Sequence, residues 1–215
     1  MTGIVSLYCL DINDFKRSFD KDKAYLSLQR LKKTLRYRNQ DDRLRSLCAG
    51  LLIEAYVGEI YYASDGQGKP QAKNGLKFNI SHSGNYVILG IAKEEIGVDI
   101  EEMIKFDFWS MREQIFSSGE INWVQADLYR FYYLWTRKES LLKACGKGFY
   151  LELCNVEVMP RPNKNRQKFN EKNYAFNTFS ESNYMISVCI QNKTINKITK
   201  RLLSREDVIE KLKHI

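Results

Sequence analysis

The sequence predicts an α+β protein built from two similar lobes. Patterns typical of a strand, helices and further strands follow one another, and roughly the same order returns in the second half without a visible sequence repeat. The chain has 215 residues, 44% of them apolar, which is enough for one sizeable core or for two small lobes packed together. We therefore expect an N-terminal lobe over residues 1–101 and a C-terminal lobe over residues 102–215.

The first lobe is expected to open with a strand and to continue with two helices. The first helix is basic and has apolar positions at Leu28, Leu31 and Leu35, and the second has leucines at helical spacing on one face. A glycine-rich stretch then indicates a loop, and short apolar runs after it indicate strands. The expected ranges are a strand at 4–12, helices at 22–37 and 41–56, a loop at 64–74, and strands at 76–80, 86–92 and 97–100.

The second lobe is expected to contain a long helix over residues 129–144. Gly146 and Gly148 follow it and would end it, because glycine is favoured just beyond a helix C-terminus. The other expected elements are strands with turns at 151–189, a polar loop at 159–172 and a helix at 205–212.

The net charge narrows the kind of partner. The formal charge is +8 and the pI is near 9.1, so the surface suits nucleic acid, a phosphorylated ligand or an acidic protein. No zinc-finger, RNP-like or basic-region motif accompanies this charge, so we expect no nucleic-acid binding.

Cysteine and histidine usage points to the cytoplasm. Five scattered cysteines without a C-x-x-C pair, together with only two histidines, argue against a zinc site. They fit a reducing compartment better than a secreted disulfide framework. The first ten residues lack the basic lead-in of a signal peptide, and no later apolar run is long enough to span a bilayer. We therefore expect a cytoplasmic protein with no membrane association.

A pair of carboxylates lies in the segment Gly97-Val98-Asp99-Ile100-Glu101. Strand side chains alternate, so Asp99 and Glu101 should share one face while Val98 and Ile100 point to the other. A hard cation such as Mg²⁺ would relieve the repulsion between these two carboxylates. A solvated strand end accounts for the same pattern equally well.

A second group of polar residues lies on the predicted long helix. Trp135, Glu139 and Lys143 follow one another at intervals of one turn, so one face offers an apolar anchor, an anion and a cation. Taken alone, this pattern is more often an ordinary surface salt bridge.

Two further segments carry polar residues next to strands or turns. His82 lies in Asn79-Ile80-Ser81-His82-Ser83-Gly84, where it either caps a strand end or contacts a phosphate; no G-x-S-x-G motif supports a nucleophilic serine. Lys69 lies in Gly66-Gln67-Gly68-Lys69-Pro70, which matches neither a Walker nor a dinucleotide-binding loop. It is either a plain turn or a glycine-rich edge that places Lys69 beside a nucleotide.

Taken in order, these segments resemble the Sfp-type 4′-phosphopantetheinyl transferases. The resemblance covers essentially the whole chain, and its most specific parts are GVDIE and WTRKES. It is carried by Gly68-Lys69-Pro70, Phe78-Asn79-Ile80-Ser81-His82-Ser83, Gly97-Val98-Asp99-Ile100-Glu101 and the helix residues Trp135, Thr136, Lys138, Glu139, Ser140 and Lys143.

The resemblance implies an α+β fold of two similar lobes related by a pseudo-twofold, with the active site between them. It implies transfer of the phosphopantetheine arm of coenzyme A to a serine of an apo acyl or peptidyl carrier protein, with release of 3′,5′-ADP. The implied metal is Mg²⁺, with Mn²⁺ as a substitute, and the implied assembly is a monomer. The carrier could belong to peptide, polyketide or fatty-acid synthesis.

The resemblance also implies roles for individual residues. Asp99, Glu101 and Glu139 match the metal ligands, and Lys143 matches a lysine that contacts the pyrophosphate. Glu139 is the best candidate for the base that accepts the proton of the carrier serine. The residues that match coenzyme A contacts are Arg45 and His82 at the 3′-phosphate, Ser81, Lys69 near the adenine, and first-helix cations at Arg30 and at Lys32 or Lys33.

The segment over residues 104–127 joins the two carboxylate-bearing elements and is rich in apolar groups. In the resembling family the corresponding segment borders the carrier-binding surface. We therefore expect Phe116 or a neighbour to contact the carrier protein, unless Phe116 is buried in the core.

Three other functions fit parts of the sequence. A non-catalytic binder would use the basic charge to hold a nucleotide or an acidic protein, and loss of a carboxylate would have favoured it. A nucleic-acid binder would show salt-sensitive retention on DNA. A hydrolase would cleave coenzyme A without a carrier protein.

Overall fold

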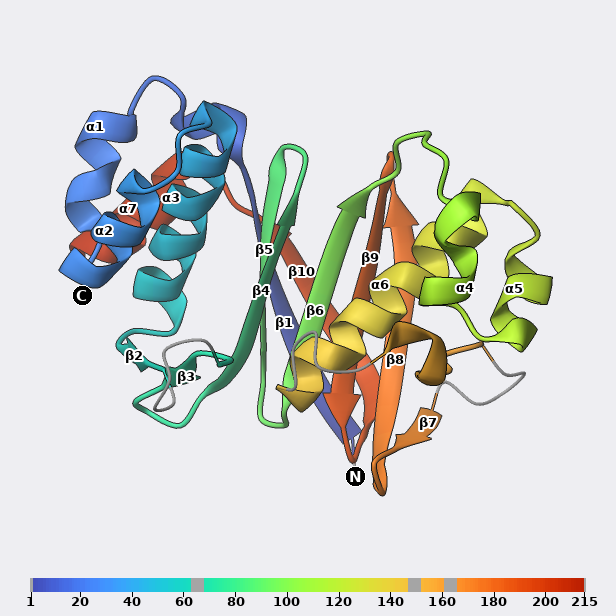
Figure 1. Ribbon diagram of the computed structural model, residues 1–215. Helices are drawn as coiled ribbons and strands as arrows, with labels where there is room; N and C mark the ends of the chain where they lie inside the picture. Colours follow the sequence, from blue (N-terminus) through green and yellow to red (C-terminus); the bar gives the residue numbers. More distant parts are fainter. Residues whose placement is uncertain (1, 63–67, 147–151, 161–165, 215) are drawn as a thin grey trace.

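The computed structural model describes residues 2–62, 68–146, 152–160 and 166–214, and it confirms the α+β class. Two four-stranded sheets stand beside each other, and helices cover the outer side of each (Figure 1). The helices are α1 (Phe19–Asp22), α2 (Leu28–Leu35), α3 (Gln40–Tyr56), α4 (Arg112–Ile115), α5 (Ser118–Val124), α6 (Leu128–Cys145) and α7 (Arg205–Lys213). Turns of 3₁₀ helix lie at Ile12–Phe15, Lys23–Tyr25, Trp109–Met111 and Leu153–Asn155.

The strands divide between two sheets and a small hairpin. The first sheet has the order β10-β1-β5-β4, the second has the order β6-β9-β8-β7, and β2 pairs with β3. Their bounds are β1 (Thr2–Asp11), β2 (Ile60–Tyr61), β3 (Gln71–Ala72), β4 (Lys77–Ser83), β5 (Tyr86–Ala92), β6 (Ile96–Glu102), β7 (Arg166–Phe169), β8 (Lys172–Glu181), β9 (Tyr184–Gln191) and β10 (Thr194–Leu202).

Three apolar clusters hold these layers together. One lies between α3 and the outer face of the first sheet, and another lies between α6 and the outer face of the second sheet. The third lies between the two sheets and takes residues from β1, β5, β6 and β9. Each long helix therefore packs on its own sheet, and the sheets pack on each other.

Side-chain alternation on β6 follows the prediction. Val98 and Ile100 belong to the core between the sheets, and their exposed fractions are 0% and 1%. Asp99 and Glu101 therefore face the opposite side, where α6 lies. This alternation places the two carboxylates between β6 and α6.

The end of the described chain returns to the first sheet. β10 pairs in parallel with β1, and α7 packs against α3. The expected boundary between residues 101 and 102 lies inside β6, a strand of the second sheet. The division into two lobes, and a pseudo-twofold between them, remain predictions.

The buried face of α2 is not the expected one. Leu28 and Leu35 are exposed, whereas Arg30 and Thr34 are buried. The Thr34 hydroxyl lies 2.9 Å from that of Ser46, and Arg30 donates to the Ser46 carbonyl oxygen at 3.3 Å. The partner surface on α3 is polar here, so it selects polar residues of α2 rather than Leu28 and Leu35. Leu31, the third expected position, is half-buried and packs against the core of the first sheet.

Other differences from the prediction are local. The expected helix over 22–37 is broken into a 3₁₀ turn and α2, the expected loop over 64–74 includes β3, and that over 159–172 includes β7. Gly146 ends α6 with a positive φ of 68°, whereas Gly148 lies outside the described residues. In the ranges that the structure describes, no helix combines the length and apolarity needed to cross a bilayer.

Candidate active site

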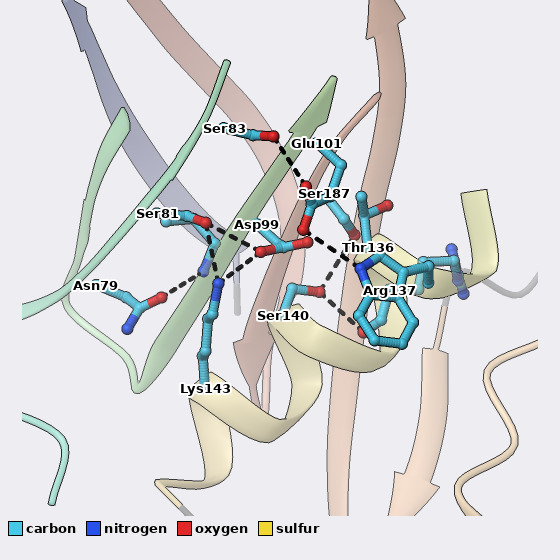
Figure 2. A network of polar contacts seen from close by, with 12 residues as sticks. Asn79, Ser81, Ser83, Asp99, Glu101, Thr136, Arg137, Ser140, Lys143 and Ser187 are labelled. Carbon is cyan, nitrogen blue, oxygen red and sulfur yellow. Dashed lines mark hydrogen bonds and ion pairs between the residues drawn. The ribbon is translucent and has the colours of Figure 1, made fainter. Parts of the chain in front are cut away.

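The candidate site lies where the edge of the first sheet meets the edge of the second. β4 and β6 belong to different sheets, and polar side chains at alternate positions of β4 reach across to β6 (Figure 2). Asn79 Oδ1 accepts from the Val98 backbone N–H at 2.9 Å, and Ser83 Oγ accepts from that of Glu102 at 3.0 Å. Between them, the Ser81 hydroxyl donates to Asp99 Oδ1 at 2.9 Å.

Asp99 is buried and is held by a lysine from α6. Lys143 Nζ lies 2.5 Å from Asp99 Oδ1 and also donates to Ser81 Oγ at 2.9 Å. Burial raises the pKa of the Asp99 carboxyl, although the Lys143 charge opposes this shift. Asp99 Oδ2 is buried and has no hydrogen-bond partner. One oxygen of Asp99 is therefore paired and the other is free to accept a ligand.

Glu101 is held by donors on both of its carboxylate oxygens. The Ser83 hydroxyl donates to Oε2 at 2.9 Å, and the Trp135 indole N–H donates to Oε1 at 3.3 Å. Burial raises the pKa of Glu101, and the nearby Asp99 charge adds to the rise. Donors from β4 and α6 thus fix this carboxylate from two sides.

Glu139 lies on α6 one turn before Lys143, and its Oε1 is buried without a hydrogen-bond partner. Burial raises the pKa of Glu139 to about 7, with a further rise from Asp99 and a smaller one from Glu101. These interactions bring the expected carboxylates Asp99, Glu101 and Glu139 into one electrostatic neighbourhood. A carboxyl with a pKa near neutrality is suited to accept a proton at physiological pH.

A glycine allows α6 to approach β6 this closely. A Cβ on Gly97 would overlap the Ser140 carbonyl oxygen and would lie 2.5 Å from the Ala144 backbone nitrogen. The helix is also tied to the second sheet by a hydrogen bond of 3.2 Å between the hydroxyls of Ser140 and Ser187, visible in Figure 2. Any larger residue at 97 would push Glu139 and Lys143 away from β6.

Two of the expected coenzyme A contacts lie at the turn that follows β4. Arg45 of α3 donates to the Gly84 carbonyl oxygen at 2.6 Å and pairs with Asp42 at 2.7 Å. The His82 side chain is partly in contact with solvent, but protein atoms around it limit the hydration of its ring. This loss of hydration lowers the pKa of His82, and the charges of Arg45 and Lys143 lower it further. The positive charges around His82 therefore form one region that extends to Lys143.

Lys69 lies near the C-terminal end of α6, where a Cβ at Gly146 would come within 3.9 Å of its side chain. Its ammonium donates to the Ile96 carbonyl oxygen at 2.8 Å and to Glu95 at 3.1 Å. Burial lowers the pKa of Lys69, while Glu95 raises it. Lys69 is thus already paired, whereas the residues of the loop before it, 63–67, lie outside the described residues.

Comparisons with known proteins identify the family. Residues 95–189, which hold the β6 carboxylates and α6, match the sequence model of the 4′-phosphopantetheinyl transferase superfamily. The 4′-phosphopantetheinyl transferase gsp of Aneurinibacillus migulanus is 36% identical over 132 residues, which cover 55% of each chain. A 4′-phosphopantetheinyl transferase of Bacillus subtilis is 31% identical over 154 residues, which cover 65% of this chain and 68% of that one.

The chain belongs to the 4′-phosphopantetheinyl transferase superfamily. Its resemblance to the Sfp-type members is confirmed, because the 4′-phosphopantetheinyl transferase Sfp of Bacillus subtilis strain 168 is 29% identical over 150 residues, covering 63% and 66% of the two chains. The chain spans about half the length of the Aneurinibacillus relative that it matches.

The carboxylates of the candidate site supply some, but not all, of the ligands that a hard cation needs. Within the described ranges, no group of three His, Cys, Asp or Glu side chains is close enough together to hold a metal ion unaided. However, the unpartnered oxygens of Asp99 and Glu139 are carboxylate donors, which Mg²⁺ prefers. Mg²⁺ is commonly held by one or two carboxylates together with substrate phosphates, and these residues fit that arrangement.

The sequence did not predict that two cations of α6, Arg137 and Lys138, are buried. Lys138 pairs with Glu120 at 2.6 Å, and both side chains are fully buried. Arg137 donates to the Val158 carbonyl oxygen at 2.8 Å and stacks on the Phe176 ring. Charged residues usually remain exposed, so their types alone do not predict this burial. The local signal that could have pointed to Glu120 is its capping-box position three residues after Ser117.

The prediction that Phe116 itself contacts the carrier protein is wrong, because Phe116 is buried. Its exposed fraction is 2%, and its ring packs edge-on against Phe131 at 5.6 Å between ring centres. Other apolar residues of the same segment are exposed instead, namely Ile104 (59%), Phe106 (40%) and Met111 (38%). The apolar run therefore contributes to both core and surface, and spacing alone did not separate them.

Proposed function

We propose that this protein transfers the 4′-phosphopantetheine group of coenzyme A to a serine of an acyl or peptidyl carrier protein, in a Mg²⁺-dependent reaction. The observation that carries the proposal is the convergence of Asp99, Glu101, Glu139 and Lys143 between β6 and α6. Three carboxylates with raised pKa values and a lysine suit a phosphoryl-transfer site, where catalysis depends on positioning and charge.

In the proposed reaction the serine oxygen forms a bond to the β-phosphorus of coenzyme A. The bond from that phosphorus to the bridging oxygen breaks, and 3′,5′-ADP leaves with the electron pair. Glu139 accepts the serine proton, because its buried Oε1 has no hydrogen-bond partner within the protein. The released proton thus has an acceptor on α6.

The charged residues around Glu139 have separate roles in the proposed reaction. Lys143 offsets negative charge on the phosphate oxygens, to which its ammonium can donate. Asp99 and Glu101 would hold Mg²⁺ together with Glu139 and the phosphates of coenzyme A, and the bound ion would supply positive charge at the reacting phosphate. Ser81 keeps Lys143 and Asp99 together through its two hydrogen bonds.

The nucleotide end of coenzyme A is proposed to lie against the cations of the first sheet and its helices. Arg45 and His82 lie at the β4–β5 turn, where Arg45 could exchange its Asp42 contact for a phosphate. A pocket of about 630 Å³ beside α2 offers further cations. It is lined by Gln29, Arg30, Lys32, Lys33, Arg36, Ile60, Tyr61 and Tyr62.

Arg30 makes this pocket suitable for an anion. Its side chain is buried and its Nε has no hydrogen-bond partner. Burial lowers the pKa of the neighbouring Lys33, and the Arg30 charge adds to this effect. A bound phosphate would give Arg30 Nε a hydrogen-bond acceptor and would offset the repulsion between the Arg30 and Lys33 charges. The first-helix cations expected from the sequence therefore line one pocket.

Carrier proteins present an acidic helix with a few apolar residues, and the surface beside the carboxylates complements such a partner. Ile104, Phe106 and Met111 are exposed just beyond the end of β6, and the net charge of the chain is +8. Charge would steer the encounter, and apolar contacts would slow dissociation. We propose this surface, rather than Phe116, as the docking site.

Release of 3′,5′-ADP from coenzyme A, measured with and without an apo carrier protein, tests the proposed reaction. Transfer predicts release only when carrier, coenzyme A and Mg²⁺ are all present, and no release after chelation. Release without carrier would identify a hydrolase, and no release under any condition would leave a non-catalytic binder. Dephospho-coenzyme A should be the poorer substrate, and Arg45→Ala should reduce that preference by about tenfold or more.

A further inference from the structure

The free edge of β6 needs partners for its backbone N–H groups. β6 is the outermost strand of the second sheet, so alternate N–H groups on its β4 side have no strand to pair with. Asn79 and Ser83 supply side-chain oxygens to two of them, at Val98 and Glu102. β4 therefore completes the edge of β6 with side chains rather than with its backbone.

Ser83 does more than complete the edge. Its oxygen accepts the Glu102 N–H, so its own hydroxyl proton is free to point at Glu101 Oε2, 2.9 Å away. A single hydroxyl thus fixes both the main chain of β6 at Glu102 and the carboxylate of Glu101. Asn79, by contrast, serves the main chain of β6 at Val98.

The three carboxylates differ in how firmly they are held. Both oxygens of Glu101 carry a hydrogen bond, from Ser83 and from Trp135. Asp99 and Glu139 each have a buried oxygen without a partner. Asp99 is held through Oδ1 alone, by Ser81 and Lys143. Glu101 is therefore the member with both oxygens bonded before any ligand binds, and Ser83 is the donor that comes from the other sheet.

We propose that Ser83 is a positioning residue that orients the Glu101 carboxylate toward the space shared with Asp99 and Glu139. It acts through Glu101 and does not touch the reacting atoms. Loss of its hydroxyl lets the Glu101 carboxylate rotate. This rotation weakens the hydrogen bond from Trp135 and moves the Glu101 oxygens away from the position in which they would face a cation together with Asp99 and Glu139. The consequence for catalysis rests on the proposed transfer reaction, but the consequence for Trp135 does not.

The indole N–H resonance of Trp135 in the metal-free protein gives the first test. The chain has three tryptophans, so Trp135→Phe assigns the signal in a ¹H–¹⁵N spectrum. Ser83→Ala is expected to shift this resonance in the direction produced by Glu101→Gln, and Ser83→Thr, which keeps the hydroxyl, is expected to restore it. Ser180→Ala, at an exposed serine of β8, serves as the matched control and should leave it unchanged.

The Mg²⁺ concentration for half-maximal transfer gives the second test, at saturating coenzyme A and carrier protein. Ser83→Ala should raise it about tenfold, and Ser83→Thr should return it to within about twofold of the wild type. If Ser83→Ala does not fold, Ser83→Cys, with its weak donor, replaces it and should behave in the same way.

An unchanged Trp135 resonance in Ser83→Ala would overturn the proposal, and so would a loss of turnover at an unchanged Mg²⁺ midpoint. A wild-type protein that transfers nothing would refute the proposed function instead, and the resonance would still decide whether Ser83 orients Glu101.

Discussion

Gly97 of β6 lies directly against the backbone of Ser140 on α6. A side chain at 97 would overlap the Ser140 carbonyl oxygen, and main-chain atoms of a helix cannot rotate away as a flexible side chain can. The contact sets the spacing between the carboxylates of β6 and the charged residues Glu139 and Lys143 of α6. The close approach of Gly97 to Ser140 therefore helps to define the candidate site, although neither residue bears a charge.

Gly97→Ala is predicted to lower both stability and transfer. The added methyl forces α6 outward, which should destabilise the fold by about 1–3 kcal/mol and separate Lys143 from Asp99. Gly119→Ala is the control, because a Cβ there meets nothing closer than 3.9 Å. Melting curves and turnover numbers measure the effect. Equal behaviour of the two variants would show that the close approach at Gly97 is unimportant.

Glu120→Gln is predicted to be strongly destabilising. It leaves the fully buried Lys138 ammonium without its carboxylate, a loss of about 3–5 kcal/mol. The melting temperature should fall by roughly 10 °C. The exposed pair Lys168–Glu171 supplies the control, since Glu171→Gln removes a solvated partner and should change little. A fall of similar size in both variants would contradict this account of the buried pair.

The metal-free protein is predicted to lose stability as pH rises from about 4.5 to about 7. Glu139 has a pKa of about 7 when folded and near 4.3 when unfolded, so the folded state binds more protons in this range. The effect should be on the order of 2–3 kcal/mol. Glu139→Gln should flatten this part of the curve, while Glu113→Gln, at an exposed side chain, should not. Urea midpoints across the range provide the measurement.

Ile104→Ser is predicted to raise the KM for carrier protein and to leave that for coenzyme A nearly unchanged. The Ile104 side chain is exposed, and only its backbone is held, by the Tyr132 hydroxyl at 3.1 and 3.2 Å. Phe116→Ala is the contrasting variant, because emptying a buried site should cost about 3–5 kcal/mol and affect both substrates together. A KM for carrier that stays at the wild-type value in Ile104→Ser would exclude this surface.

Local patterns predicted the parts of the site that lie within one element. Alternation on β6 and helical spacing on α6 placed Asp99, Glu101, Glu139 and Lys143 correctly relative to their neighbours in sequence. The pairing of β10 with β1 was beyond such reasoning, because it joins residues at opposite ends of the chain. Long-range pairing leaves no local periodicity.

The polar residues that support the site were hard to predict for a related reason. From the sequence, Ser83 is an ordinary serine at a strand end, and its contact with Glu101 exists only because β6 lies beside β4. Arg30 would be expected to be exposed, and it is buried because α2 packs against α3 at Ser46. Burial of a charged or polar group depends on a partner elsewhere in the fold, and the sequence around it carries no mark of that partner.

The intact mass of an apo carrier protein, after incubation with coenzyme A and Mg²⁺, tests the proposed transfer most directly. A panel of carriers from peptide, polyketide and fatty-acid synthesis covers the open choice of partner. The account predicts that at least one gains the mass of a single phosphopantetheine group, and that Asp99→Asn and Glu139→Gln proteins, shown to be folded by their melting curves, produce no gain in the same time. No gain on any carrier with the wild-type protein, or full gain with both variants, would contradict it.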